Sequence, residues 1–284
     1  MKSDSFHRSD GPCVGNDITD EVFSGIRDIL LEQTGLDLAM YKDQCMKRRI
    51  ASRIRACGME RCSAYVDRLR RDPDEAEILI ETLAIHVSRF FRNPEVFALL
   101  EAEVLPPLIK SALQRSDQVL RIWSAGCSGG EEPYSMALLL SELAPPELNV
   151  EILASDIGSE VLQQARNGCF DPVRLSEVPQ RVLDEYFKPA GSRHQLVESV
   201  RRRVRFFDQN LLTGDYPNQV DLILCRNVLI YFSREDQDRI LQRFHMSLNK
   251  TGMLVLGTTE SLFGSARQLF EACYGKERIF RRIP

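Results

Sequence analysis

The chain has 284 residues, of which 43% are hydrophobic and 27% charged, and its formal net charge is −4. This composition is typical of a globular protein and excludes the disordered and fibrous classes. No apolar run approaches the roughly 18 residues that a membrane-spanning helix needs, so we expect no direct insertion into a membrane. We expect one large or two unequal domains. The first 18 residues lack the apolar region of a secretory signal, which predicts a cytoplasmic location.

The charge is unevenly distributed. Residues 37–71 contain ten Lys or Arg and four acids, a net +6, which leaves −10 for the rest of the chain. Such a local excess favours an acidic partner over general affinity for nucleic acid. The eight cysteines are dispersed, without CxxC or zinc-ligand spacing, so we predict reduced thiols, no structural disulfide and no metal.

Residues 19–85 are predicted to form a small helical N-terminal domain after a flexible tail over 1–18. Thr19 or Asp20 caps the first helix, and Gly35 ends it. In the second helix, apolar residues at i, i+4 and i+8 form a stripe, and the basic residues around it are expected to face outward. These apolar residues are Met46, Ile50 and Ile54, and the later helices are expected over Tyr41–Ala56, Ser63–Arg70 and Glu75–Ile85.

From about residue 118 strands alternate with helices, after a linker or helix over 86–117. This alternation predicts an α/β domain over 118–284 with a mostly parallel, doubly wound sheet. Residues 168–207 break the pattern and suggest a small insertion with a helix over Ser176–Phe187. The expected strands are Val119–Ser124, Val150–Ser155, Val220–Cys225, Gly252–Gly257 and an antiparallel Arg278–Arg282, and the expected helices are Glu131–Leu143, Ser159–Asn167 and Arg234–Asn249.

The best local signal is the turn between the first strand and the first helix of this domain. Ligands of open α/β sheets bind at the carboxyl ends of strands, and the glycines Gly126, Gly129 and Gly130 permit a close approach of backbone to a ligand. Glu131 and Glu132 at the helix start would repel a pyrophosphate, so a ligand with a cationic amine fits better than NAD. Taken alone, a tight structural turn with a capped helix explains the motif equally well.

Two other strand ends carry polar residues. Asp156 ends the second strand, where an acid commonly binds the hydroxyls of a ribose, although such an Asp is as often a helix cap. Arg226 and Asn227 interrupt an apolar run after the third strand, and Tyr231 follows. Buried Arg and Asn are costly unless they are hydrogen-bonded, so we expect both side chains to face the same cleft as the glycine-rich turn. The alternative is that Asn227 caps a helix and that Arg226 is solvated.

Several segments together resemble one family, the chemotaxis receptor methyltransferases of the CheR type. They are HVSRFFRNPEVF (86–97), WSAGCSGGEEPYS (123–135), ASDI (154–157), NLL (210–212) and CRNVLIYF (225–232). The resemblance implies a Rossmann-like class I methyltransferase fold with a helical N-terminal domain and a small β insertion. It implies transfer of a methyl group from S-adenosylmethionine to glutamate side chains of chemoreceptors for sensory adaptation, with S-adenosylhomocysteine as product.

The resemblance also implies roles for individual residues. Arg92 and Tyr231 match active-site residues, and either Glu131 or Glu132 matches the acid that binds the methionine end of the cofactor. Where the family often has Asn-x-Thr, this chain has His86 and Ser88. The positions matched to cofactor contacts are His86, Ser88, Arg92, Gly126, Glu131, Glu132, Asp156, Asn210, Leu211, Arg226 and Asn227.

The partner that the resemblance implies is the acidic cytoplasmic helical bundle of a chemoreceptor, and we expect a monomer that binds no nucleic acid. The basic second helix is then predicted to dock on that bundle through Lys47, Arg48, Arg49, Arg53 and Arg55. A catalytically idle scaffold and a Rossmann dehydrogenase are the alternatives. The paired acids and the missing GxGxxG argue against a dehydrogenase.

Overall fold

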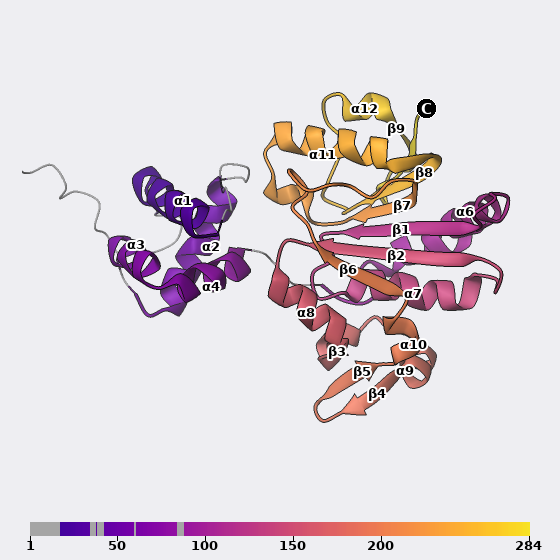
Figure 1. Ribbon diagram of the computed structural model, residues 1–284, viewed down its shortest axis with the longest axis horizontal. Helices are drawn as coiled ribbons and strands as arrows, with labels where there is room; N and C mark the ends of the chain where they lie inside the picture. Colours follow the sequence, from indigo (N-terminus) through magenta and orange to yellow (C-terminus); the bar gives the residue numbers. More distant parts are fainter. Residues whose placement is uncertain (1–17, 35–37, 39–42, 60, 84–87) are drawn as a thin grey trace, which may run out of the picture. The chain divides into compact units, whose positions relative to one another are not determined.

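The computed structural model describes residues 18–34, 38, 43–59, 61–83 and 88–284. They divide into two compact units, each described by itself (Figure 1). The first comprises Met1–Ile85 and Tyr231–Ser233, and the second comprises His86–Ile230 and Arg234–Pro284. Within the part of the chain that the structure describes, no helix is long and apolar enough to cross a membrane. Gly35, His86 and Ile85 lie outside the described residues.

The first unit is helical, as predicted. Val22 donates its backbone N–H to the Thr19 hydroxyl at 3.4 Å, so Thr19 caps the first helix. The predicted stripe of Met46, Ile50 and Ile54 is buried, with at most 2% of each residue exposed. The described helices are α1 (Asp20–Thr34), α2 (Asp43–Ala56), α3 (Cys62–Arg71) and α4 (Pro73–Leu83).

A buried carboxylate ties three of these helices together. Glu75 of α4 is fully buried and accepts two hydrogen bonds of 2.8 Å from the Arg53 guanidinium and one of 2.8 Å from the Tyr65 hydroxyl. Arg68 completes the cluster, with 2.8 Å between Nη2 and Oε2 of Glu75. Burial alone would raise the pKa of Glu75, but the hydrogen bonds from Arg53 and Tyr65 hold it below its ordinary value.

One expectation about the cysteines is wrong. Cys62, which is 6% exposed, is disulfide-bonded, although we predicted reduced thiols throughout. Spacing along the chain does not show which thiols a fold brings within bonding distance, and the dispersal of the cysteines was therefore a poor guide. Among the residues that the structure describes, the free cysteines are Cys57, Cys127, Cys169, Cys225 and Cys273.

The second unit is built on a seven-stranded sheet of order β6-β2-β1-β7-β8-β10-β9. The first five strands in this order are parallel, and β10 runs antiparallel to β8 and β9, which confirms the predicted terminal strand. The strands are β1 (Val119–Ala125), β2 (Asn149–Asp156), β6 (Val204–Asp208), β7 (Val220–Cys225), β8 (Leu248–Leu256), β9 (Phe270–Tyr274) and β10 (Ile279–Arg282).

Helices cover both faces of this sheet, because alternate residues of a strand point to opposite sides. Ile122 of β1 joins a core cluster with apolar residues of α5, α6 and α7. Its neighbour Trp123 packs edge-on against Phe244 of α11, with 5.4 Å between ring centroids. The doubly wound α/β prediction is therefore confirmed. The helical elements are α5 (Pro94–Leu99), η2 (Leu100–Val104), α6 (Leu105–Leu113), α7 (Glu131–Leu143), α8 (Ser159–Asn167), α10 (Glu198–Arg201), η4 (Leu229–Tyr231), α11 (Arg234–Ser247) and α12 (Ala266–Leu269).

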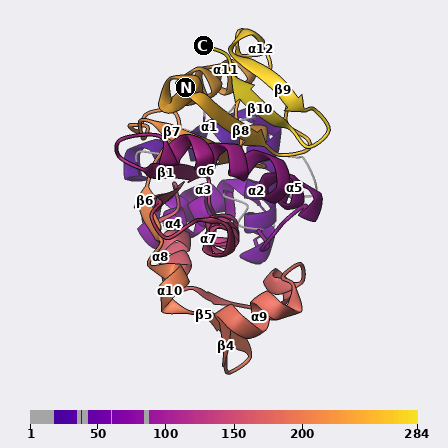
Figure 2. The same cartoon turned by 90° about the vertical axis from the view of Figure 1, so that its right-hand side faces the viewer.

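A second, three-stranded antiparallel sheet of order β3-β5-β4 forms a lobe beyond the β6 side of the large sheet (Figures 1 and 2). Its elements are β3 (Cys169–Phe170), η3 (Pro172–Leu175), α9 (Gln180–Tyr186), β4 (Phe187–Ala190) and β5 (Arg193–Leu196). The last residues of the range expected to form the insertion, 204–207, instead belong to β6 (Val204–Asp208), which pairs in parallel with β2 in the large sheet.

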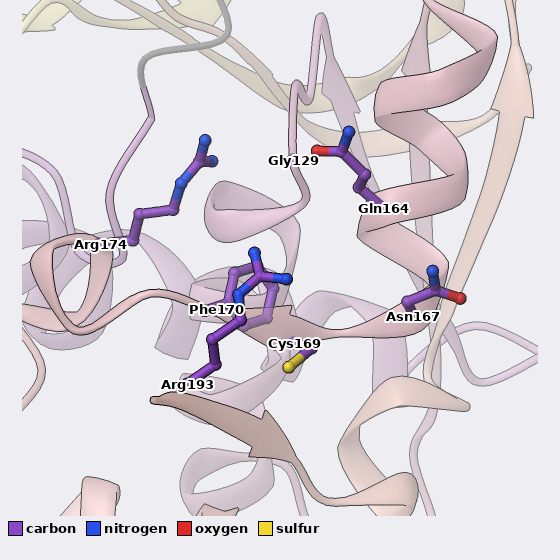
Figure 3. Close-up of a pocket in the computed structure, with 7 residues that line it drawn as sticks. All are labelled: Gly129, Gln164, Asn167, Cys169, Phe170, Arg174 and Arg193. Carbon is purple, nitrogen blue, oxygen red and sulfur yellow. The ribbon is translucent and has the colours of Figure 1, made fainter. Parts of the chain in front are cut away.

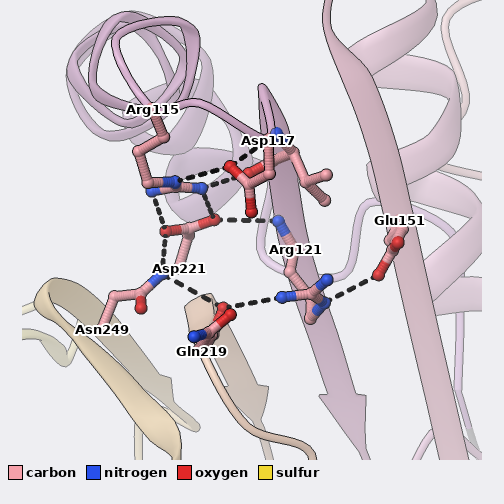
Figure 4. A network of polar contacts seen from close by, with 8 residues as sticks. Arg115, Asp117, Arg121, Glu151, Gln219, Asp221 and Asn249 are labelled. Atoms are coloured by element: carbon pink, nitrogen blue, oxygen red, sulfur yellow. Dashed lines mark hydrogen bonds and ion pairs between the residues drawn. The ribbon is translucent and has the colours of Figure 1, made fainter.

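A polar network joins the amino-terminal ends of β1 and β7 (Figure 4). Asp221, which is 1% exposed, accepts two hydrogen bonds of 2.8 Å from the Arg115 guanidinium. The backbone N–H of Arg121 and the Asn249 side chain also donate to Asp221, at 2.9 and 2.6 Å. This network fixes the edge of the sheet opposite to the carboxyl ends of the parallel strands.

Candidate active site

The turn after β1 requires glycine at two positions. Gly126 and Gly130 have φ of +79° and +89°, in the left-handed region that favours glycine. A Cβ on Gly126 would lie 2.4 Å from a methyl carbon of Val228, in the loop after β7. The turn therefore packs directly on the segment that follows a neighbouring strand, which brings two of the predicted site segments together.

Asp156 lies beside this turn at the end of β2 and is 9% exposed. Its carboxylate accepts hydrogen bonds from the backbone N–H of Ser128 at 2.8 Å and of Gly158 at 3.2 Å. Asp208 stands opposite Asp156 in the β2–β6 register, and burial together with the charge of Asp156 raises the pKa of Asp208. No sequence pattern indicated Asp208, because β6 was not expected to join the large sheet.

The two adjacent glutamates have different surroundings. Glu131 is fully buried and forms an ion pair with Arg174 of η3 through Oε1, while its Oε2 has no hydrogen-bond partner. Glu132 accepts a hydrogen bond of 2.7 Å from the Ser124 hydroxyl and lies 3.5 Å from Arg226. Burial raises the pKa of Glu132, and the charge of Arg226 opposes that rise.

Arg226 links the loop after β7 to the segment before α5. It is 7% exposed and donates hydrogen bonds of 2.7 Å to the Arg92 carbonyl and to the Asn93 side chain. Burial lowers the pKa of Arg226, the charge of Glu132 raises it, and the charge of Arg92 lowers it further. The predicted residues Arg92, Glu132 and Arg226 therefore form one charged cluster.

Asn210 and Leu211 follow β6. The Asn210 side chain accepts the backbone N–H of Leu212 at 2.9 Å, and Leu211 is 6% exposed. The Leu211 carbonyl accepts hydrogen bonds from the Tyr216 hydroxyl at 2.6 Å and from Arg243 at 2.8 Å. These contacts fix the backbone of this loop at the same edge of the sheet as Asp156.

Unpartnered polar atoms gather at this edge. Among the residues that the structure describes, ten buried side-chain N or O atoms lack a hydrogen-bond partner, and six belong to segments that follow β1, β6, β7 and β8. Buried polar groups are costly without a partner, so this concentration fits a site that a polar ligand completes. The six atoms are Ser128 Oγ, Glu131 Oε2, Gln209 Oε1, Arg226 Nε, Asn227 Oδ1 and Glu260 Oε1.

A cavity of about 280 Å³ flanks the turn on the side of the small sheet (Figure 3). The guanidinium groups of Arg174 and Arg193 reach it from η3 and β5 and are paired with Glu131 and Asp171. Its lining is Gly129, Gln164, Asn167, Cys169, Phe170, Arg174 and Arg193. Only Gly129 comes from the glycine-rich turn, so this cavity adjoins the strand-end cluster rather than containing it.

Ser88 is partly exposed, and His86 falls outside the described residues. Tyr231 groups with the first unit, where the Arg49 guanidinium lies 4.7 Å from the centroid of its ring.

The five cations of α2 do not form a single outward face. Arg48 and Arg55 are exposed. Lys47 pairs with Asp20, and Arg53 pairs with buried Glu75. The expectation that all five face outward is wrong for Arg49, which is 6% exposed and donates a hydrogen bond to the Leu83 carbonyl. Helical period alone misplaced Arg49, because it lies next to Ile50 at the edge of the apolar stripe.

Comparisons with known proteins match nearly the whole chain. The family model described as "CheR methyltransferase, SAM binding domain" matches residues 86–279, and "CheR methyltransferase, all-alpha domain" matches residues 21–84. A "Chemotaxis protein methyltransferase" of Listeria monocytogenes is 35% identical over 238 residues, covering 84% of this chain and 89% of the relative. The protein of the same name in Salmonella typhimurium is 33% identical over 262 residues, covering 88% and 87%.

Proposed function

The chain belongs to the CheR methyltransferase family, and we propose that the polar groups at the strand ends of its second unit hold the cofactor. It is a chemotaxis protein methyltransferase, which uses S-adenosylmethionine to methylate glutamate side chains of chemoreceptors. The observation that carries the site proposal is the group of six unpartnered buried atoms at one sheet edge.

Each part of the cofactor has a matching group in this proposal. Asp156 binds the ribose hydroxyls, and the loop of Asn210 and Leu211 lines the adenine. Of the two glutamates, we assign the methionine ammonium to Glu131, because its Oε2 lacks a partner while Glu132 is engaged with Ser124 and Arg226. This assignment leaves Glu132 to hold Arg226 in place.

Arg226 and Asn227 are assigned to the sulfonium side of the site. In this proposal Arg92 contacts both the cofactor and the acceptor. Its positive charge acts to lower the pKa of both Glu132 and Arg226. In this proposal, Gly126 has no side chain that would keep the backbone of the turn away from the cofactor. The two positions ahead of Arg92, His86 and Ser88, remain predicted cofactor contacts.

When bound, S-adenosylmethionine supplies a methyl group on a sulfonium centre, from which a neutral thioether leaves. A glutamate carboxylate has an ordinary pKa near 4.3, so the acceptor is ionised at pH 7 and needs no general base. The protein's task is to hold the carboxylate in line at roughly 3–3.5 Å and to exclude water. We assign this orientation to Arg92 and Tyr231.

The receptor docks on α2 in this proposal. The exposed cations Arg48 and Arg55 would attract an acidic helical bundle most strongly. Lys47 and Arg53 already form ion pairs within the protein, and Arg49 is buried. The chain is proposed to act as a monomer in the cytoplasm, without binding nucleic acid, and size-exclusion chromatography with light scattering tests the monomer.

Calorimetric titration tests the site. Wild-type protein should bind S-adenosylmethionine and S-adenosylhomocysteine saturably and should not bind NAD, and a folded Asp156→Ala variant should lose measurable binding. Undiminished binding by this variant would place the cofactor elsewhere. Absence of binding by folded wild type would favour a scaffold without catalysis.

A further inference from the structure

The loop that carries Arg226 and Asn227 rests on a buried carboxylate. Glu260, which is 4% exposed, accepts hydrogen bonds on Oε2 from the backbone N–H of Asn227 at 2.9 Å and of Gly257 at 2.5 Å. Burial raises the pKa of Glu260, and the backbone N–H groups of Asn227, Gly257, Leu229 and Val228 oppose that rise. Glu260 therefore binds the end of β8 to the loop after β7.

Backbone amides, not a cation, hold this carboxylate. Within the described part of the chain, no ion pair within 4 Å joins Glu260 to a basic side chain. Hydrogen bonds from backbone N–H to a carboxylate are charge-assisted and directional, and the two that converge on Oε2 fix the backbone that donates them. Glu260 thus restrains main-chain geometry, and at longer range its negative charge opposes the lowering of the Arg226 pKa.

The restrained backbone has an uncommon conformation. Asn227 has φ of +62°, in the left-handed region that few residues other than glycine and asparagine adopt. A Cβ on Gly257 would lie 2.7 Å from the Asn227 nitrogen and 2.7 Å from Glu260 Oε2. The space between the two strand ends therefore fits this carboxylate closely, and its hydrogen bond from the Asn227 N–H holds that residue in this conformation.

The conformation of Asn227 sets the direction of its neighbours. Arg226, one residue earlier, is fixed at its far end by the Arg92 carbonyl and Asn93, and Asn227 Oδ1 is buried without a partner. A rotation of the backbone at Asn227 would move both side chains away from the strand-end cluster.

We propose that Glu260 is a positioning residue for the cofactor, because it holds Asn227 and Arg226 in the orientation that binds. This inference rests on the proposed function, which assigns those two residues to the sulfonium side of the site. No motif in the sequence singled out Glu260, which lies 33 residues after Asn227.

The test measures S-adenosylhomocysteine binding by calorimetry and folding by thermal melting on the full chain. Glu260→Gln keeps the shape and one acceptor oxygen but removes the charge, and Glu260→Asp keeps the charge but shortens the reach. Asp221→Asn is the matched control, since it alters an equally buried carboxylate at the opposite sheet edge. We expect about a tenfold rise in Kd for each Glu260 variant, against less than about twofold for the control at a comparable loss of Tm.

A double-mutant cycle separates positioning from general stability. If Glu260 acts through Asn227, then Glu260→Gln should raise Kd by less than about twofold in an Asn227→Ala background. Folded Glu260 variants with wild-type Kd, or effects that add fully to Asn227→Ala, overturn the proposal. It is also overturned, in favour of a purely structural role, if neither Glu260 variant folds. Failure of wild type to bind would instead contradict the proposed function.

Discussion

Glu131 and Glu132 are adjacent at the start of α7, yet their carboxylates are committed to different partners. Glu131 pairs with Arg174 through one oxygen and leaves the other unpartnered, whereas Glu132 contacts Ser124 and Arg226. The structure thus separates two residues that the sequence left equivalent.

This separation predicts different effects on ligands that have or lack the methionine end. Glu131→Gln should weaken S-adenosylhomocysteine binding about tenfold, since a charge-assisted hydrogen bond to the ammonium is lost. It should leave binding of 5′-methylthioadenosine, which has no amino-acid moiety, unchanged. Glu132→Gln, the matched control, should weaken both ligands alike through Arg226. Equal losses for both ligands in Glu131→Gln would refute the assignment.

The exposed cations of α2 predict an effect confined to the receptor. Reversing both charges, with Arg48→Glu and Arg55→Glu, should lower the rate of receptor methylation about tenfold at low ionic strength, and added salt should narrow the difference. Calorimetry should give an unchanged Kd for S-adenosylhomocysteine. Lys276→Glu with Arg281→Glu, which reverses two exposed charges of the second unit, is the control. Matching losses in both double variants would point to net charge rather than to α2.

The polar network at the amino-terminal sheet edge predicts a loss of stability without a loss of binding. Asp221→Ala removes the acceptor of Arg115, Arg121 and Asn249 and should lower the free energy of unfolding by about 3 kcal/mol. Chemical denaturation measures this loss. Cofactor affinity below the unfolding transition should remain within about twofold of wild type; a larger change would connect this edge to the site.

The buried Glu75 cluster predicts a dependence of stability on pH. The pKa of Glu75 is lowered in the folded protein, so its ion pairs contribute fully above the unfolded value near 4.3 and are lost as pH falls through the folded value. Scanning calorimetry between pH 3 and 7 should therefore show a Tm gap between wild type and Glu75→Gln that is largest near pH 7 and shrinks below about pH 4. A gap that stays constant with pH would show that shape, not charge, explains the effect.

Much of the fold follows from sequence periodicity. The helices Glu131–Leu143 and Ser159–Asn167 have the predicted bounds, because their apolar residues recur at the helical period and a glycine precedes each helix. The edge strand β6 was not placed in the large sheet, since the irregular residues before it resemble the rest of the insertion. Its pairing with β2 is a long-range contact that no local pattern encodes.

The candidate site was predictable only where polar residues interrupt apolar strands. Asp156, Arg226 and the glycine-rich turn carry that signal, and the structure brings all three to one sheet edge. Glu260 and Asp208 give no such signal, because an acidic residue next to other polar residues is expected to be exposed to solvent. The prediction for Arg49 was wrong for the opposite reason. A cation on a basic helix is expected to be exposed, but tertiary packing buries Arg49.

The most direct test of the account is methyl transfer itself. Wild-type protein, S-adenosylmethionine labelled on the methyl group and a fragment of a receptor's cytoplasmic helical bundle should give labelled fragment whose label alkali releases as methanol, the behaviour of a glutamate methyl ester. Asp156→Ala should give none. Label that resists alkali, or transfer undiminished in the Asp156→Ala variant, would contradict the account.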